Sequence, residues 1–380
     1  MLRALPIVLC LLSGCYVSHG DADGGPPRRD GGGPPPPPTR DLDLLFVVDN
    51  SNSMGEEQAS LAAQLPLFLR VLTTGDFNQD GDTTDDEDFV PFTGLQVGVV
   101  TTDMGTGGFT VPTCARSAVG DDAVLRTAGN TSDATCEPSY PPFLAFAGSA
   151  EQLAHEAGCV TTVGTGGCGF EQQLEAALKA LSPAAPQAWT APDYAPPTFF
   201  GNTLGHGADT AFVRDGSVLG IVFVTDEEDC SASDPELFSP MSTEYVGDLN
   251  LRCLRYAADA VHPLERYVAG YLQLRRSPRR LAVLGIVGLP LDLAPATSAP
   301  IGYDAILDDP RMQEVVDPTM PNRLVPSCNV AGRGLAFPPR RFVGLVRQRE
   351  ARGASVSLQS ICQASYPTAP LIDALVRAAR

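Results

Sequence analysis

Two short apolar segments of this chain, residues 42–48 and 219–224, are each followed at once by oxygen-bearing side chains. Largely apolar runs of this length are typical of strands buried on both faces, as in a parallel sheet covered by helices. Ligands of such sheets gather at the carboxyl ends of the strands, so the side chains that follow the two segments are predicted to meet. They are Asp49, Ser51 and Ser53 after the first segment and Asp226 after the second.

Asp49, Ser51 and Ser53 offer one carboxylate and two hydroxyls from a single turn. Hard oxygen donors of this kind are preferred by Mg²⁺ and similar divalent cations. The alternative is that these side chains cap the helix that follows them, because Asp and Ser are favoured at helix N-termini. The position of Asp226 favours the interpretation as a metal site over helix capping, since it brings a second carboxylate from a different strand.

Strands and helices are predicted to alternate through most of the chain. Apolar runs typical of buried strands span Leu42–Val48, Leu95–Val100, Leu219–Val224, Leu281–Val287 and Ser355–Ile361. Between them, apolar residues recur at helical spacing, most regularly from Phe170 to Leu181. This alternation predicts an α/β fold with a doubly wound, mainly parallel sheet flanked by helices. The remaining length is interpreted as loop insertions rich in Pro, Gly, Ser and Thr, at about 104–158, 184–216, 230–275 and 289–339.

The motif Asp49-x-Ser51-x-Ser53 after a first strand, with a later strand that closes in Asp226, resembles the von Willebrand factor A (VWA) domain and its metal-ion-dependent adhesion site. The resemblance covers residues 41–380 and implies a Rossmann-like sheet flanked by helices. It also implies that Mg²⁺ or another divalent cation is held by these four side chains. An open coordination position of that ion would accept an acidic side chain of a protein partner, so the implied function is adhesion.

The family pattern also has a Thr or Ser between the two segments, after two glycines and before an amphipathic helix. In this chain Cys168 follows Gly166-Gly167 and stands where the hydroxyl is expected. The nearest hydroxyl belongs to Thr165, which is offset by three residues. Thr165 is therefore the remaining candidate for the third ligand, and the site is expected to be weaker than the family pattern implies.

Residues 1–14 are predicted to be a lipoprotein signal peptide. A basic start precedes an apolar stretch, residues 4–12, that is too short to span a membrane. Leu12-Ser13-Gly14-Cys15 then resembles the bacterial lipobox, which implies that Cys15 is lipidated and begins the mature protein. The alternative is an ordinary signal peptide with an incidental cysteine. Because Tyr16 is not the Asp that commonly retains lipoproteins at the inner membrane, the resemblance implies the outer membrane of a Gram-negative bacterium.

Residues 15–40 are rich in Pro and Gly and include the run of prolines Pro34–Pro38. Such a segment cannot bury a core and favours extended polyproline II structure, so it is predicted to tether the folded domain to the lipid. No later segment has the long uncharged apolar run of a transmembrane helix. The lipid is therefore the expected contact with the membrane.

The chain has ten cysteines, of which Cys10 lies in the signal peptide and Cys15 is expected to carry lipid. The others are even in number in a protein bound for an oxidising compartment, so they are predicted to form disulfides. Pairing of neighbours along the sequence suggests Cys114–Cys136, Cys159–Cys168, Cys230–Cys253 and Cys328–Cys362, although many other connectivities are open. Zinc is not expected, because no Cys-x-x-Cys spacing occurs and there are only 4 histidines.

A second candidate metal site lies in the acidic loop Asp76–Glu87. The loop fits the EF-hand calcium pattern, with Gly81 at the sharp turn and oxygen donors at Asp76, Asn78, Asp80, Asp82 and Glu87. A strand is predicted after this loop, where a paired EF-hand would have a helix. An isolated Ca²⁺-binding loop is therefore favoured, and the alternative is a solvated acidic turn that binds no ion.

Charge and motifs argue against several functions. A formal net charge of −19 disfavours binding to nucleic acid, which would repel such a surface. Gly164-x-Gly166-x-x-Gly169 matches the letters of a dinucleotide fingerprint, but no acidic residue follows at the required distance, so no nucleotide is expected. No nucleophile elbow or zinc-protease helix is present, and the protein is not expected to be an enzyme.

Two functions are left. The first is a VWA-like binding module, anchored in the cell envelope, that uses its divalent ion to bind a protein partner. The alternative is a calcium-stabilised structural lipoprotein of the envelope, in which the adhesion site is vestigial because Cys168 replaces the hydroxyl.

Overall fold

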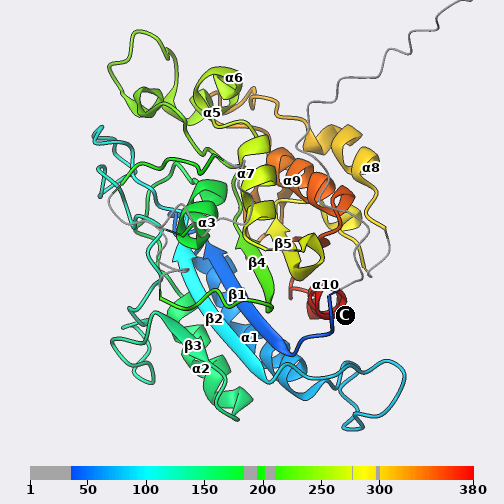
Figure 1. Ribbon diagram of the computed structural model, residues 1–380. Helices are drawn as coiled ribbons and strands as arrows, with labels where there is room; N and C mark the ends of the chain where they lie inside the picture. The colour runs from blue at the N-terminus through cyan, green and yellow to red at the C-terminus, as the bar shows by residue number, and fades with distance from the viewer. Residues whose placement is uncertain (1–35, 184–194, 202–209, 276, 297–299) are drawn as a thin grey trace, which may run out of the picture. The chain divides into compact units, whose positions relative to one another are not determined.

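The computed structural model describes residues 36–183, 195–201, 210–275, 277–296 and 300–380 (Figure 1). The predicted signal peptide, Cys15 and all but the last few residues of the predicted tether lie outside these ranges, as does part of the expected insertion at 184–216.

Six strands form one sheet in the order β3–β2–β1–β4–β5–β8 (Figure 1). Their bounds are β1 Asp41–Val48, β2 Gly94–Thr101, β3 Phe143–Ala145, β4 Val218–Val224, β5 Leu281–Val287 and β8 Ser355–Ser360. All neighbouring strands are parallel except β3, which is antiparallel to β2. The predicted mainly parallel sheet is thus confirmed, with all five predicted strands in it. The edge strand β3 was not predicted, because three residues carry too little periodicity to indicate a strand.

Helices cover both faces of the sheet and bury two apolar cores. One core packs the sheet against α1 (Gly55–Thr74), α2 (Ala150–Thr161) and α10 (Thr368–Ala379). The other packs it against α3 (Gln173–Leu181), α7 (Glu265–Gln273) and α9 (Arg340–Ala351). Alternate side chains of β1 enter opposite cores, Leu42, Leu44, Phe46 and Val48 on one side and Leu45 and Val47 on the other. Burial on both faces explains why the strand sequence is mostly apolar, and its one buried charge, Asp43, is paired with Arg214 and Arg275.

Short elements occupy the long connections between these core elements. They are α5 Arg252–Arg255, α6 Ala257–Ala260, α8 Tyr303–Asp308, the hairpin of β6 Cys328–Asn329 and β7 Leu335–Ala336, and the 3₁₀ turns Pro235–Phe238, Leu249–Leu251, Pro278–Arg280, Leu291–Leu293 and Pro310–Met312. Two of the expected insertions also contain core helices, since 104–158 includes most of α2 and 230–275 includes α7. The surrounding residues are rich in Pro, Gly, Ser and Thr, so the sequence does not reveal these helices clearly.

Four disulfides join the eight cysteines between Cys114 and Cys362. The predicted pairs Cys230–Cys253 and Cys328–Cys362 are confirmed. The other two predicted pairs, Cys114–Cys136 and Cys159–Cys168, are wrong, and the structure instead has Cys114–Cys168 and Cys136–Cys159.

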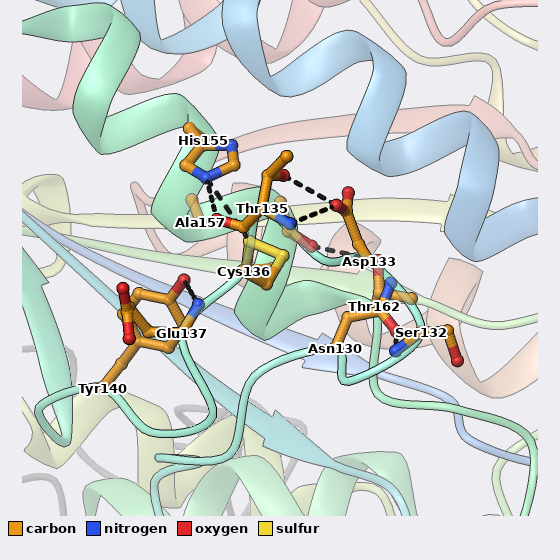
Figure 2. Close-up of a disulfide and its surroundings, with 12 residues drawn as sticks. Asn130, Ser132, Asp133, Thr135, Cys136, Glu137, Tyr140, His155, Ala157 and Thr162 are labelled. Atoms are coloured by element: carbon orange, nitrogen blue, oxygen red, sulfur yellow. Dashed lines mark hydrogen bonds between the residues drawn. A yellow bond between two sulfur atoms is a disulfide. The ribbon is translucent and has the colours of Figure 1, made fainter.

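Tertiary contacts explain this exchange of partners. The amide of Gly169 donates to the carbonyl of Thr113 at 3.2 Å, which places the neighbouring cysteines together. The amide of Asn130 likewise donates to the carbonyl of Cys159 at 2.9 Å, so the loop that contains Cys136 lies on α2. Figure 2 shows this second disulfide with His155 beside it, 3.0 Å from the carbonyl oxygen of Thr135. Sequence proximity cannot reveal such contacts.

The disulfides indicate an extracytoplasmic compartment, because such bonds persist in oxidising environments. In the part of the chain that the structure describes, no helix is both long enough and apolar enough to cross a membrane.

Disulfide mapping tests the corrected connectivity. Digestion of unreduced protein should yield peptides that join Cys114 to Cys168 and Cys136 to Cys159, identified by mass spectrometry. Thiol labelling after denaturation without reductant should give no signal from these residues. Recovery of a Cys114–Cys136 peptide would contradict the described arrangement.

Candidate metal centre

The carboxyl ends of β1 and β4 lie side by side in the middle of the sheet. Val48 pairs with Val224, and the amide of Asp49 donates to the carbonyl of Val224 at 3.0 Å. The residues that leave the two strands therefore start from adjacent positions, as the parallel arrangement predicts. Asp49 and Asp226, which are far apart in the sequence, are brought to the same edge of the sheet.

Asp49 is completely buried, and its carboxylate is held by two hydrogen bonds. Oδ1 accepts from the amide of Ser51 at 2.8 Å, and Oδ2 accepts from the hydroxyl of Thr225 at 2.7 Å. The side-chain amide of Gln173 lies 2.9 Å from the same hydroxyl. Burial raises the pKa of Asp49, and the hydrogen bonds from Thr225 and Ser51 oppose that rise.

The two predicted hydroxyl ligands face each other, with 3.2 Å between the Oγ atoms of Ser51 and Ser53. Their loop is fixed by the buried side chain of Gln58, whose Nε2 donates to the carbonyls of Asp49 and Gly164, at 2.9 Å each. Its Oε1 accepts from the amide of Gly164 at 3.0 Å. Gln58 thus ties the end of β1 to the segment before α3.

Helix capping does not account for the Asp49 motif. The residue at the N-cap of α1 is Met54, and no side chain makes a capping hydrogen bond there. The hydroxyls of Ser51 and Ser53 are therefore not used for the role that the alternative interpretation gave them.

Asp226 is only 1% exposed, and its Oδ1 has no hydrogen-bond partner among the described residues. The main chain of Asp226 is fixed, since its carbonyl accepts from the amide of Phe337 at 2.8 Å. Burial raises the pKa of Asp226 well above its usual range, the charge of Asp49 raises it further, and a hydrogen bond from Ser53 acts in the opposite direction. A buried oxygen without a partner is costly, which makes this atom a candidate to bind a cation.

Two further carboxylates, Glu171 and Glu227, belong to the same site and were not predicted from the sequence. The pKa of each is raised well above its ordinary value, first by burial and then by neighbouring carboxylates, which for both include Asp49 and Asp226. The main causes of the pKa shifts of these four acids are burial, neighbouring carboxylates and hydrogen bonds. The site therefore concentrates negative charge.

The segment before α3 does not bring a hydroxyl into this cluster. Cys168, at the position where the family pattern has Thr or Ser, is 1% exposed and is bonded to Cys114. Thr165, the remaining candidate, is exposed. It does not line the cavity that contains Ser51 and Ser53. The expected third hydroxyl ligand is thus not placed at the site.

A cavity of about 440 Å³ opens beside the carboxylates. Ser51, Ser53, Glu171 and Glu227 line one part of it. The remaining wall mixes apolar, basic and further acidic groups, among them Phe170, Phe337, Arg323, Arg341 and Glu314. The volume lies within the range of about 300–1,000 Å³ that binds small ligands or protein side chains.

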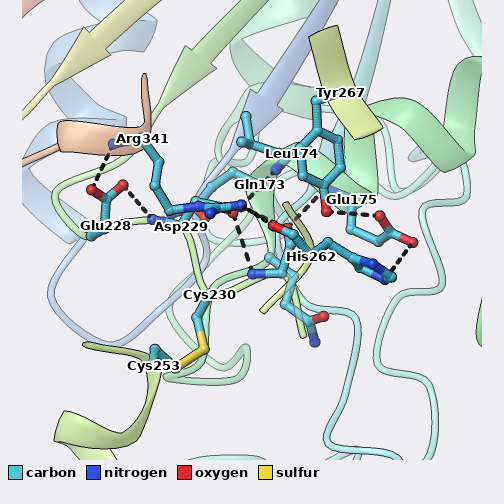
Figure 3. A network of polar contacts seen from close by, with 12 residues as sticks. Gln173, Leu174, Glu175, Glu228, Asp229, Cys230, Cys253, His262, Tyr267 and Arg341 are labelled. Atoms are coloured by element: carbon cyan, nitrogen blue, oxygen red, sulfur yellow. Dashed lines mark hydrogen bonds and ion pairs between the residues drawn. A yellow bond between two sulfur atoms is a disulfide. The ribbon is translucent and has the colours of Figure 1, made fainter. Parts of the chain in front are cut away.

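A polar network supports the cavity from the side of α9 (Figure 3). Arg341 donates from Nε to Oδ2 of Asp229 at 3.0 Å, and its backbone amide donates to Glu228 at 2.8 Å. Oδ1 of Asp229 accepts from the amide of Leu174 at 2.9 Å, so the network reaches the start of α3. Burial raises the pKa of Glu228 to about 8. These contacts hold the loop after β4 in a fixed position relative to α3 and α9.

The acidic loop lies between α1 and β2, at the opposite edge of the sheet from Asp49. Its turn has the geometry that the calcium pattern predicts. The amide of Gly81, which has a φ of 88°, donates to Oδ2 of Asp76 at 3.2 Å. Backbone amides of Asp80 and Asp82 donate to the side chains two residues before them. Glu87 is exposed, and no hydrogen bond of the described chain reaches its carboxylate.

Within the described ranges, no three His, Cys, Asp or Glu side chains converge closely enough to hold a metal ion by themselves. A cation near Asp49 would therefore use the serine hydroxyls together with carboxylates, and side chains would have to rotate toward it. No protein-family model matches this chain, and no curated protein matches its sequence significantly. The VWA resemblance consequently depends on the motif residues and on the sheet that places them.

Stability in the absence of divalent ions should fall as pH rises. Asp49, Asp226, Glu171 and Glu227 bind protons more tightly in the folded than in the unfolded protein, since their pKa values are raised from the ordinary values of 3.8 and 4.5. The stabilisation that results from this proton binding is complete at pH values below the ordinary pKa values. It is lost as pH rises through the pKa values of the folded protein, which for Glu228 is about 8. Urea unfolding in chelator should therefore give a smaller free energy of unfolding at about pH 8 than at about pH 5. A rise over that range would show that the carboxylates are paired with positive charge.

Proposed function

We propose that this protein is a VWA-like binding module that uses a divalent cation to bind a protein partner. The cation would be held by Asp49, Ser51, Ser53 and Asp226. The observation that supports this most strongly is the buried Oδ1 of Asp226, which lacks a partner among the described residues and lies near the carboxylates of Asp49 and Glu57.

Buried like charges can be tolerated in only a few ways. The acids can take up protons, or a cation can neutralise them, because an unpaired buried charge costs several kcal/mol. The hydroxyls of Ser51 and Ser53 lie beside these acids, 3.2 Å apart, and neither of them caps α1. A divalent cation uses both features, since it neutralises charge and accepts hydroxyl ligands.

The cavity next to the acids gives a partner access to the ion. Ser51 and Ser53 line this cavity, so a coordination position would face it. The resemblance implies that an acidic side chain of the partner fills that position. Apolar groups such as Phe170 and Phe337 would exclude water from the contact, which strengthens the charge interaction.

The anchoring of the module is also a proposal. The lipobox-like sequence at Cys15 and the Pro- and Gly-rich residues 15–40 favour a lipidated protein held away from the outer membrane by a tether. An envelope location agrees with the disulfides, which require an oxidising compartment.

The alternative is a calcium-stabilised structural protein of the envelope with a vestigial adhesion site. The disulfide of Cys168 supports it, because this residue cannot supply the ligand that the family pattern has there. The turn of the acidic loop supports it too, because Gly81 and Asp76 already make the contact that an EF-hand loop requires. The two functions differ in whether binding of a protein partner depends on an ion at Asp49.

Replacement of Asp49 tests the proposed function. Asp49→Ala should abolish partner retention from envelope extract, because it removes the central carboxylate of the site. In an Asp80→Ala background, which removes the acidic loop as a second site, it should also abolish the ion-dependent rise in melting temperature. Chelator should have the same effect on the wild type. Glu151→Ala, which changes an exposed carboxylate on α2, is the matched control and should behave as the wild type. Equal retention by wild type and Asp49→Ala, with or without chelator, would favour the structural alternative.

Calcium is expected to bind the acidic loop weakly, with a dissociation constant on the order of 10⁻⁴ to 10⁻³ M. Calcium at about 10 mM should then stabilise the fold by about 1.4 to 2.7 kcal/mol. Asp80→Ala should remove this contribution, as measured by calcium-dependent thermal unfolding in an Asp49→Ala background. The control Asp86→Ala changes an exposed carboxylate outside the ligand pattern and should retain it. No calcium-dependent shift in the Asp49→Ala protein would show that the loop is a solvated turn.

A further inference from the structure

Glu171 lies in the segment where the family pattern places the third ligand, three residues after Cys168. The disulfide to Cys114 removes Cys168 from any role as a ligand, and Thr165 does not line the cavity that Ser51 and Ser53 line. Glu171 does line that cavity, and its side chain is only 5% exposed. It is therefore the residue of this segment that offers an oxygen donor to the site.

The main chain around Glu171 is fixed by contacts with the two strands that flank the site. Its carbonyl accepts from the amide of Cys230 at 2.8 Å, in the loop after β4. The next residue, Gln172, donates from its backbone amide to the carbonyl of Thr102 at 3.1 Å and from Nε2 to Gly105 at 3.0 Å, both after β2. The fold thus fixes the main chain of Glu171 beside the cavity that its side chain lines.

Buried negative charge surrounds the Glu171 side chain. Asp49, Glu227 and Asp226 all act on it electrostatically, and Oδ1 of Asp226 is a buried oxygen that lacks a partner among the described residues. In this arrangement no three of the acids converge on one point. Like charges repel in the absence of a cation, and the adjoining cavity of about 440 Å³ leaves room for Glu171 to rotate toward an ion.

We infer that Glu171 is the metal ligand that the segment before α3 supplies, and that the completed site prefers Ca²⁺ to Mg²⁺. This inference rests on the proposed divalent-ion site. Mg²⁺ requires near-ideal octahedral geometry, retains several waters and is usually bound through one or two carboxylates. Ca²⁺ accepts more oxygen ligands, including several carboxylates, in irregular geometry. Replacement of a hydroxyl by a carboxylate therefore moves the site toward calcium.

Calorimetric titration of the full-length mature protein in detergent tests the inference. The Asp80→Ala background removes the acidic loop as a second calcium site. In this background Ca²⁺ should bind at least about tenfold more tightly than Mg²⁺. Glu171→Gln should weaken Ca²⁺ binding by at least about tenfold and reduce the preference over Mg²⁺. Glu151→Gln on the exposed face of α2 is the matched control and should change neither value.

Melting in chelator gives a second readout that distinguishes a ligand from a residue with a structural role. Glu171→Gln removes one of several like charges and nearly preserves shape, so it should raise the melting temperature of the ion-free protein. It should also reduce the further rise that Ca²⁺ produces. A structural residue would instead lower stability with and without the ion by the same amount.

The outcomes separate this inference from the function on which it rests. If Asp49→Ala abolishes ion binding but Glu171→Gln binds Ca²⁺ as tightly as the background, the inference is overturned and the proposed function stands. Equal or tighter binding of Mg²⁺ in the background protein also overturns it. If the Asp80→Ala protein binds no divalent ion at all, both the inference about Glu171 and the proposed function are overturned.

Discussion

Burial of like charge at the carboxyl edge of the sheet is the constraint on which the site depends. Asp49 follows β1 and Asp226 follows β4. Because these two strands are paired in parallel, both carboxylates are buried in the same region. Glu171 and Glu227 add to the same charge. Such an arrangement opposes folding unless protons or a cation neutralise it, so folding is coupled to the binding of whichever neutralises the acids.

The surrounding contacts hold the acids together against their repulsion. Gln58 fixes the turn after β1 to the segment before α3 through three hydrogen bonds. Thr225 orients the carboxylate of Asp49, and the pair Asp229–Arg341 joins the loop after β4 to α3 and α9. The loops that carry the acids are therefore tied to neighbouring strands and helices by hydrogen bonds, which favours a site with a defined ligand geometry.

Much of the sheet and the meeting of Asp49 with Asp226 could be predicted from the sequence, because strand periodicity and parallel topology are local and general properties. The contributions of Glu171 and Glu227 could not, since burial and neighbouring charge arise only after the loops are placed. The disulfide partners of Cys114 and Cys136 could not be predicted for the same reason, because backbone contacts between distant loops decide which cysteines meet. The role of Gln58 was also not visible, although its position one turn after the motif is a signal that could have been used.

The most direct measurement of the central claim is the position of a bound ion. Crystals of the protein grown with Mn²⁺, which scatters anomalously and accepts the same oxygen ligands, would show it without reference to any partner. The account predicts an anomalous peak within coordination distance of Ser51, Ser53 and Asp226, at the mouth of the cavity. A structure at the same Mn²⁺ concentration in which these side chains contact only water, with no peak between them, would contradict the account.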